Sequence, residues 1–101
     1  MSNVEFLNDV VGRRYRLLLD GAEVGFIDYD PVGDTSILIK HAEIAQEHEG
    51  KGLGSQLVRN ALDDIRRRGL TVIPICPYTL NFIRNHREYI DLVRAEMRAS
   101  I

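Results

Sequence analysis

A glycine-rich segment at residues 49–55 constrains this chain more than any other stretch. It reads Glu-Gly-Lys-Gly-Leu-Gly-Ser, between an apolar strand-like run and a stretch with helical periodicity. Glycine permits positive φ and lets another molecule approach the backbone closely. Unpaired N–H groups and the dipole at the start of a helix attract anions. The segment therefore predicts a phosphate or pyrophosphate site, with a flexible turn before a helix as the plainer alternative.

Two common phosphate-binding motifs do not fit this segment. A Walker loop has four residues between its first glycine and Gly-Lys-Ser/Thr, whereas here Gly50-Lys51 is followed by Gly52. A dinucleotide fingerprint needs Gly, Ala or a similarly small residue three positions after its second glycine, where this chain has Ser55. It also needs an acidic residue after a second strand, and none follows at that distance. The predicted anion site is therefore of another kind.

Length and composition narrow the class of protein. The chain has 101 residues, of which 45% are hydrophobic and 28% charged, as in an ordinary globular domain. A net charge of -2 argues against nucleic acid as the main partner, and one cysteine excludes an internal disulfide. We find no signal-peptide pattern and no apolar run approaching the roughly 20 residues of a membrane span. We therefore expect one domain, residues 1–101, in the cytoplasm and away from membranes.

The first half of the chain predicts an antiparallel meander. Asp20-Gly21 is a strong signal for a type I′ hairpin between strands 14–19 and 24–29. Alternation places Val24, Phe26 and Asp28 on one face of the second strand. The other elements are a short strand or irregular lead-in at 4–12, a turn at 30–34 and a long strand at 35–44. In that long strand Ile37, Ile39, His41 and Glu43 alternate against Leu38, Lys40, Ala42 and Ile44.

The second half predicts a helical crossover between parallel strands. Apolar residues recur at helical spacing over 52–68, and Gly69 is placed to end that helix. Arginines at 66–68 either oppose the negative end of the helix dipole or bind phosphate. A strand at 70–75 ends at Pro77, and helices are expected at 79–85 and 88–99. Strand, helix and strand form a right-handed parallel unit, so the fold class is α+β with a mixed sheet.

This order of elements, together with the glycine segment, resembles the GNAT N-acetyltransferases, and in particular their short members. The glycines resemble the acetyl-CoA pyrophosphate loop, Gln/Arg-x-x-Gly-x-Gly/Ala. The usual family member has two helices between its first two strands, where this chain has the tight Asp20-Gly21 turn. The likeness covers roughly residues 10–95 and is carried by residues 41–44, 50–55, 73–78 and 86–89.

The resemblance implies that acetyl-CoA, or coenzyme A, lies between strands 35–44 and 70–75. The pantetheine arm would pair with backbone near Ile44 and Ala45, and the pyrophosphate would bind the amides of 51–55. Glu49 stands where the family usually has Gln or Arg, and its carboxylate would repel phosphate unless Lys51 offsets it. The full set implied for the cofactor is Ile44, Ala45, Glu49, Gly50, Lys51, Gly52, Leu53, Gly54, Ser55, Asn81, Phe82 and Arg84.

Cys76, His41 and Glu43 are the candidates for catalysis. Cys76 ends a strand at the carboxyl edge of the predicted sheet, where its thiolate could accept an acetyl group. A buried free cysteine acting as a small hydrophobe is the alternative. His41 could deprotonate Cys76 or an incoming amine, and Glu43 could orient His41 or act as the base. The alternatives are a hydrogen-bonded strand histidine for His41 and a solvated strand carboxylate for Glu43, while His48 and His86 are expected at the surface.

Two further expectations concern metals and the leaving group. Tyr78 and Tyr89 are candidates to protonate a leaving thiolate, or they are core aromatic residues. His41, Cys76 and His86 lack the spacing of metal ligands, so no metal site is expected.

Two hypotheses about function follow from different classes of protein. The first is an acetyl-CoA-dependent enzyme that transfers acetyl to an unknown amine, either directly or through an acetyl-Cys76 thioester. The second is an acetyl-CoA-binding module without catalysis, acting through a protein partner. A purely structural domain would require that the glycine segment bind nothing. A monomer or weak dimer is expected, because the meander leaves strand edges free.

Overall fold

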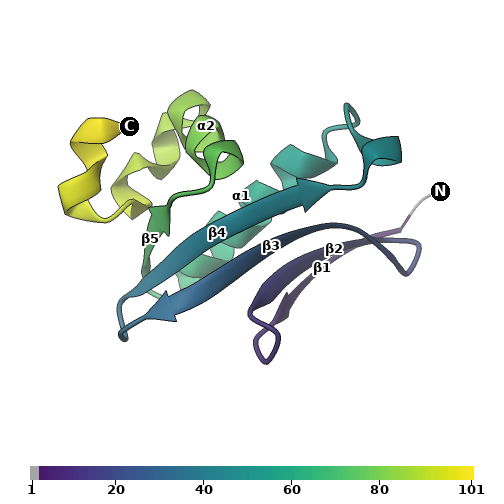
Figure 1. The fold of residues 1–101 in the computed structure, drawn as a ribbon, viewed down its shortest axis with the longest axis horizontal. Coiled ribbons are helices and arrows are strands. Elements are labelled where there is room, and N and C mark those ends of the chain that lie inside the picture. The colour runs from purple at the N-terminus through teal and green to yellow at the C-terminus, as the bar shows by residue number, and fades with distance from the viewer. Residues whose placement is uncertain (1–2) are drawn as a thin grey trace.

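The computed structural model describes residues 3–101 and contains a five-stranded sheet in the order β1-β2-β3-β4-β5. The first four strands pair antiparallel, and β5 pairs parallel to β4 (Figure 1). The predicted α+β fold with a mixed sheet is confirmed. The strands are β1 (Val4–Asp9), β2 (Arg14–Leu19), β3 (Ala22–Val32), β4 (Ser36–Ile44) and β5 (Thr71–Pro74). The helices are η1 (Gln46–His48), α1 (Leu53–Arg67), α2 (Pro77–Asn85), η2 (Arg87–Leu92) and η3 (Ala95–Ser100).

The hairpin between β2 and β3 has the predicted turn. Asp20 has φ 50° and Gly21 has φ 86°, as a type I′ turn requires at its two central residues. The possible lead-in at 4–12 contains a regular strand, β1, which pairs along the whole of β2. β3 extends beyond the predicted 24–29 at both ends, because its ends pair with β2 and β4.

Two β-bulges change which side chains face the core. Val24 is an extra residue between the pairs Leu17–Gly25 and Leu18–Glu23, and Lys40 is an extra residue in β4. A bulge shifts the two-residue alternation by one position. The expectation that Val24, Phe26 and Asp28 share one face is therefore wrong, since Val24 is buried and the other two are half-buried.

The bulge at Lys40 has the same effect in β4. Ile37 and Ile39 are buried on the inner face, the face that carries α1, and Ala42 and Ile44 also pack against the core. Past the bulge, His41 and Glu43 are exposed, in register with Asp28 and Phe26 of β3. His41 and Glu43 thus lie on the outer face of the sheet, opposite to the face of Ile37 and Ile39.

Helix α1 covers the inner face of the sheet, as its periodicity predicts. Its buried residues are Gly54, Leu57, Val58, Ala61, Leu62 and Ile65. Gly69, with φ 70°, ends the helix, and the amides of Gly69 and Leu70 bond to the carbonyls of Arg66 and Ile65. This is a Schellman motif. Figure 1 shows α1 running behind the strands and the C-terminal turns gathered beside β5.

The predicted terminal helix at 88–99 is wrong. The chain forms two 3-10 helices, η2 and η3, separated by extended backbone at Val93. Val93 makes a parallel bridge to Val72, and the Arg94 amide donates to the Val72 carbonyl at 3.0 Å. Pairing with the outer edge of β5 thus outweighs helix propensity at this point. Pro77 does not simply end a strand either, because it is the first residue of α2.

Candidate active site

A cavity lies along the part of β4 that β5 does not cover. β4 pairs with β5 only from Ser36 to Ile39, although β4 continues to Ile44. A cavity of about 920 Å³ occupies this opening, within the size range of small-molecule sites. Its wall includes Ala42–Ala45 from β4 and the following loop, residues 23–26 from β3, and the first turn of α1.

The backbone of β4 offers one side of this cavity. The Ala45 amide donates to the Val24 carbonyl at 2.8 Å, and the Ala45 carbonyl accepts from the His48 amide at 2.9 Å. Both backbone groups of Ala45 are therefore engaged within the protein, which does not favour the expected pairing of Ala45 with a ligand. Backbone groups alternate in direction along a strand, so the amide and carbonyl of Ile44 face the opening.

The start of α1 offers hydrogen-bond donors. The first intrahelical bond runs from the Gln56 amide to the Gly52 carbonyl at 3.1 Å. The amides of Leu53, Gly54 and Ser55 consequently have no acceptor within the helix. No side chain caps this end, and its first turn contains no acidic residue. Three free amides at a positive helix end make a site for an anion.

Two of the three glycines are required by backbone conformation. Gly50 and Gly52 both have φ 79°, where a side chain is strained, although a Cβ would meet nothing at either position. These turns bring the chain from η1 into α1 with its amides facing the cavity. Gly54 differs, because it is helical and buried against another side chain.

The charged residues on the cavity wall are acidic. Among residues 3–101 the lining includes Glu23, Glu43 and Glu49 but no lysine or arginine. Lys51 is exposed and does not line the cavity, so it is not placed to offset Glu49 there. His48 does line it and is half-buried rather than a surface residue, and its Nδ1 atom is buried without a hydrogen-bond partner.

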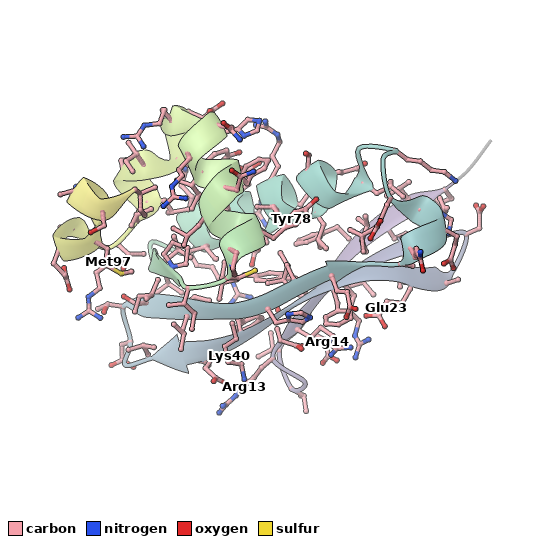
Figure 2. The ribbon with its side chains drawn as sticks, turned by 45° about the horizontal axis from the view of Figure 1, so that its top comes forward. Arg13, Arg14, Glu23, Lys40, Tyr78 and Met97 are labelled. Carbon is pink, nitrogen blue, oxygen red and sulfur yellow. The ribbon has the colours of Figure 1, made fainter. Side chains whose placement is uncertain are left out.

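Tyr78 stands at the border between this cavity and a smaller groove. The groove, about 190 Å³, is lined by Ser55, Tyr78, Asn81, Phe82, Asn85 and His86. Tyr78 is 47% exposed and lines both spaces. Figure 2 shows its side chain between α2 and α1, on the side of the sheet opposite to Arg14 and Glu23.

The residues expected on α2 have different surroundings. Asn81 is exposed and lines the groove, whereas Phe82 is 5% exposed and belongs to the core. Arg84 is exposed and lines neither space. His86 is half-buried, not a surface residue, since its ring stacks on Phe82 at 3.9 Å. Its Nδ1 lies 2.8 Å from the Phe82 carbonyl, which makes Nδ1 the donor.

The three catalytic candidates are not gathered in one place. Cys76 is 3% exposed at the N-cap of α2 and is absent from the walls of both the cavity and the groove. His41 and Glu43 lie on the outer face with side chains 59% and 60% exposed, and their Nε2 and Oε2 atoms are 3.5 Å apart. Only Glu43 also lines the cavity.

An ion pair lies on the outer face beside the residues that face Glu43 and His41 across β3. Arg14 bonds to both carboxylate oxygens of Asp28, at 2.7 and 3.1 Å, and lies 3.8 Å above the ring of Phe26. The ring of His41 is 5.9 Å from that of Phe26. Figure 2 shows Arg14, Glu23 and Lys40 on this side of the sheet. The β3 part of the site was not anticipated, because the sequence does not reveal the bulge at Val24.

Tyr89 has a structural environment. It is 4% exposed, and its hydroxyl donates to Asp63 of α1 at 2.8 Å. Burial, followed by the bond to Asp63, raises the pKa of Tyr89 above its ordinary value. Over residues 3–101 no group of three or more His, Cys, Asp or Glu side chains is arranged to hold a metal ion. No helix in that range has the length and apolar character to span a membrane.

Comparison with known proteins identifies the family. A family model described as GCN5-related N-acetyl-transferase matches residues 14–92. The chain therefore belongs to the GCN5-related N-acetyl-transferase family. Membership supports acetyl-CoA-dependent acetyl transfer in general terms. No curated protein matches the chain.

Solved structures share the fold at low identity. A GCN5-like protein from Staphylococcus aureus, studied by NMR, has a TM-score of 0.71 and 22% identity over 93% of this chain and 91% of its own. The ribosomal-protein-S18-alanine N-acetyltransferase from Escherichia coli has a TM-score of 0.62 and 15% identity over 80% of this chain and 51% of its own. A GNAT family acetyltransferase from Elizabethkingia anophelis with acetyl-CoA bound has a TM-score of 0.58 and 14% identity over 75% of this chain and 51% of its own. The chain spans about half the length of the last two proteins.

Proposed function

We propose that this protein is an acetyl-CoA-dependent N-acetyltransferase that acts on an amine. The observation that carries the proposal is the cavity on the open edge of β4, which combines a free strand edge with the free amides of α1. An amide-rich arm attached to a pyrophosphate matches that combination, because strand edges pair with amides and helix starts bind anions. The acetyl-CoA-bound neighbour of the same fold is consistent with such use.

The proposed placement uses residues on two walls. The pyrophosphate binds the amides of Leu53, Gly54 and Ser55, after the turns at Gly50 and Gly52. The pantetheine arm pairs with Ile44 along β4, while Ala45 contributes only its side chain to the wall. Asn81 is placed to contact the part of the ligand that reaches the groove. Phe82 supports the wall from the core, and Arg84 would have to approach a phosphate from outside.

We place the acceptor amine on the outer face, near Glu43. Glu43 lines the cavity and is also open to solvent, so its carboxylate can take a proton from an amine. The amine nitrogen forms a bond to the acetyl carbon while the carbon–sulfur bond breaks, and the electron pair leaves with the sulfur as coenzyme A thiolate. His41, 3.5 Å from Glu43, would orient that carboxylate or pass its proton to solvent.

Transfer through an acetyl-Cys76 thioester is the second route within this proposal. It requires the Cys76 thiol, which is 3% exposed, to open toward the ligand. The burial of Cys76 favours direct transfer, and the family likeness keeps the thioester route in the proposal. We also propose a cytoplasmic monomer or weak dimer formed of one domain, with no nucleic acid or membrane partner.

Mass spectrometry tests the function and separates the routes. The protein is incubated with acetyl-CoA and weighed under native and then denaturing conditions. We expect a native complex with acetyl-CoA, unchanged mass on denaturation, and acetylation of an added amine that Glu43→Gln reduces at least about a hundredfold, as is typical of a lost general base. A denatured chain one acetyl group heavier, and lighter again in Cys76→Ala, would establish the thioester route. Absence of any complex would refute the proposed function.

A binding module without catalysis is a second candidate. One observation favours it, namely that within residues 3–101 no helix covers His41 and Glu43, whose side chains are 59% and 60% exposed. A module binds acetyl-CoA with the same residues but acetylates no amine at any pH. Equal background rates in wild type and Glu43→Gln, with intact binding in both, would favour the module.

A further inference from the structure

We propose that Gly54 is a positioning residue for Tyr78, and that it seats the Tyr78 hydroxyl as a further donor at the anion site of α1. This inference rests on the proposed function for the nature of the ligand, but not for the contact itself. The glycine segment at 49–55 would then have two separate tasks. Gly50 and Gly52 shape the loop, while Gly54 makes room for a side chain from another helix.

The contact between Gly54 and Tyr78 is the first observation. Gly54 is the second residue of α1 and has ordinary helical backbone, so its conformation does not require glycine. A Cβ at this position would overlap the Tyr78 hydroxyl oxygen and lie 2.9 Å from Cζ and 3.3 Å from Ile44 Cγ1. The phenol therefore occupies the volume that any other residue at position 54 would need.

The contrast with the other two glycines is the second observation. At Gly50 and Gly52 a Cβ would meet no atom within 4 Å, and both have φ 79°. These positions exclude other residues through backbone strain. Gly54 excludes them through a steric contact with Tyr78, so the three glycines should respond differently when Tyr78 is changed.

The state of the Tyr78 hydroxyl is the third observation. Over residues 3–101 no hydrogen bond involves this hydroxyl, whereas the hydroxyls of Tyr15, Tyr29 and Tyr89 are all bonded. Tyr78 lines both the cavity and the groove and lies against the turn that carries the free amides of 53–55. A hydroxyl held there can donate to the same anion that the amides bind.

Pro77 and Cys76 hold the base of this arrangement. Pro77 is the first residue of α2, and its fixed φ sets the direction in which the helix starts. Cys76 precedes it as a buried N-cap residue whose carbonyl accepts the Leu80 amide at 3.0 Å. Tyr78 therefore leaves the first turn of α2, and its hydroxyl lies against the first turn of α1.

A double-mutant cycle between Gly54 and Tyr78 tests the contact without any ligand. Thermal unfolding is measured for wild type, Gly54→Ala, Tyr78→Ala and the double variant, with Gly50→Ala as the matched glycine control. We expect Gly54→Ala to lower the midpoint in the wild-type background and to have little effect in the Tyr78→Ala background. Gly50→Ala should lower the unfolding midpoint by the same amount in both backgrounds. Equal losses from Gly54→Ala in the two backgrounds would overturn the proposal.

Isothermal titration with coenzyme A tests the donor. We expect Tyr78→Phe, which keeps the ring, to weaken binding about fivefold, the size of one ordinary hydrogen bond. Gly54→Ala should weaken binding in the wild-type background but add little to the loss in Tyr78→Phe. Unchanged affinity in Tyr78→Phe would overturn the donor role. If wild type itself binds no coenzyme A, the proposed function fails, and the unfolding cycle still decides whether Gly54 positions Tyr78.

Discussion

The hydroxyl of Tyr15 in β2 donates a hydrogen bond to Oδ2 of Asp64 near the end of α1, at 2.9 Å. Tyr15 is fully buried, and Asp64 also bonds to Arg67 and Arg68, at 2.7 and 3.1 Å. A carboxylate close to the negative end of a helix is thus balanced by two guanidinium groups and one phenol. This cluster fixes the far end of α1 to the sheet, while the near end carries the anion site.

The first prediction concerns alkaline stability. Burial, followed by the bond to Asp64, raises the pKa of Tyr15 above its ordinary value. The folded protein resists ionisation of Tyr15, so its contribution to stability is full below the unfolded pKa near 10 and is lost as pH rises above it. We expect Tyr15→Phe to cost about 1 kcal/mol at neutral pH and to reduce the alkaline loss. Denaturant unfolding at a series of pH values checks both, and an unchanged alkaline slope in the variant would contradict the assignment.

The second prediction concerns acid stability. The Arg66 guanidinium, bonded to both oxygens of Asp91 at 2.9 and 3.1 Å, lowers the pKa of that carboxyl below its usual 3.8. The contribution of this ion pair to stability is present above the pKa that Asp91 has in the unfolded chain. It is lost as pH falls through the lower pKa that Asp91 has in the folded protein. The pair is exposed, so it should be worth at most about 1 kcal/mol. We expect Arg66→Gln to flatten the decline of stability below pH of about 4.

Arg84→Gln is the control for the acid experiment. Arg84 takes part in no ion pair among residues 3–101, so removing its charge changes the net charge equally but breaks no bond to Asp91. The two variants would show the same decline of stability at low pH only if net charge, and not the Arg66–Asp91 pair, governed that decline.

The third prediction concerns Glu49. Its carboxylate lines the cavity where we place the pyrophosphate, and two unit charges about 4 Å apart in water repel by about 1 kcal/mol. We expect Glu49→Gln to tighten coenzyme A binding about three- to fivefold at low salt, and less at high salt. Glu47→Gln is the matched control, since Glu47 is exposed in η1, two residues before Glu49, and does not line the cavity. Titration calorimetry at two ionic strengths measures the affinity of each variant for coenzyme A. An equal gain in affinity in both variants would mean that net charge, and not the position of Glu49, governs binding.

The fourth prediction concerns Gly25 of β3. A Cβ here would overlap Ile44 Cδ1 and lie 3.1 Å from the Glu43 carbonyl oxygen and 3.2 Å from Leu57 Cδ2. We expect Gly25→Ala to destabilise the protein by about 1–3 kcal/mol through overpacking. Adding Ile44→Val removes the Cδ1 atom and should recover part of that loss. Chemical unfolding of the single and double variants measures it, and strictly additive losses would refute the steric explanation.

The sequence predicted the elements that depend on local signals. These elements are the Asp20-Gly21 turn, the end of α1 at Gly69 and the glycine-rich start of α1. Each contains at least one residue with a positive φ, which is typical of glycine and of tight turns. These signals place the helix start beside the open edge of β4, so the location of the candidate site was predictable.

The parts that failed depend on contacts between distant segments. The bulges at Val24 and Lys40 follow from how β3 fits both neighbours, and no turn residue marks them. The bulge at Lys40 decides that His41 and Glu43 face outward, away from Ile37 and Ile39. The break at Val93 follows from a bridge to Val72, which lies on a different element. The role of Gly54 depends on Tyr78 in the same way.

The bulge at Lys40 divides β4 into two halves with different surroundings. Residues 36–39 are held by strands on both sides and supply buried isoleucines to the core. Residues 41–44 are held on one side only, and Ala42, Glu43 and Ile44 line the cavity. Substitutions at the exposed positions 41 and 43 should therefore cost little in folding, whereas Ala42 and Ile44 still pack against the core. One half of the strand thus builds the core, and the other half borders the opening.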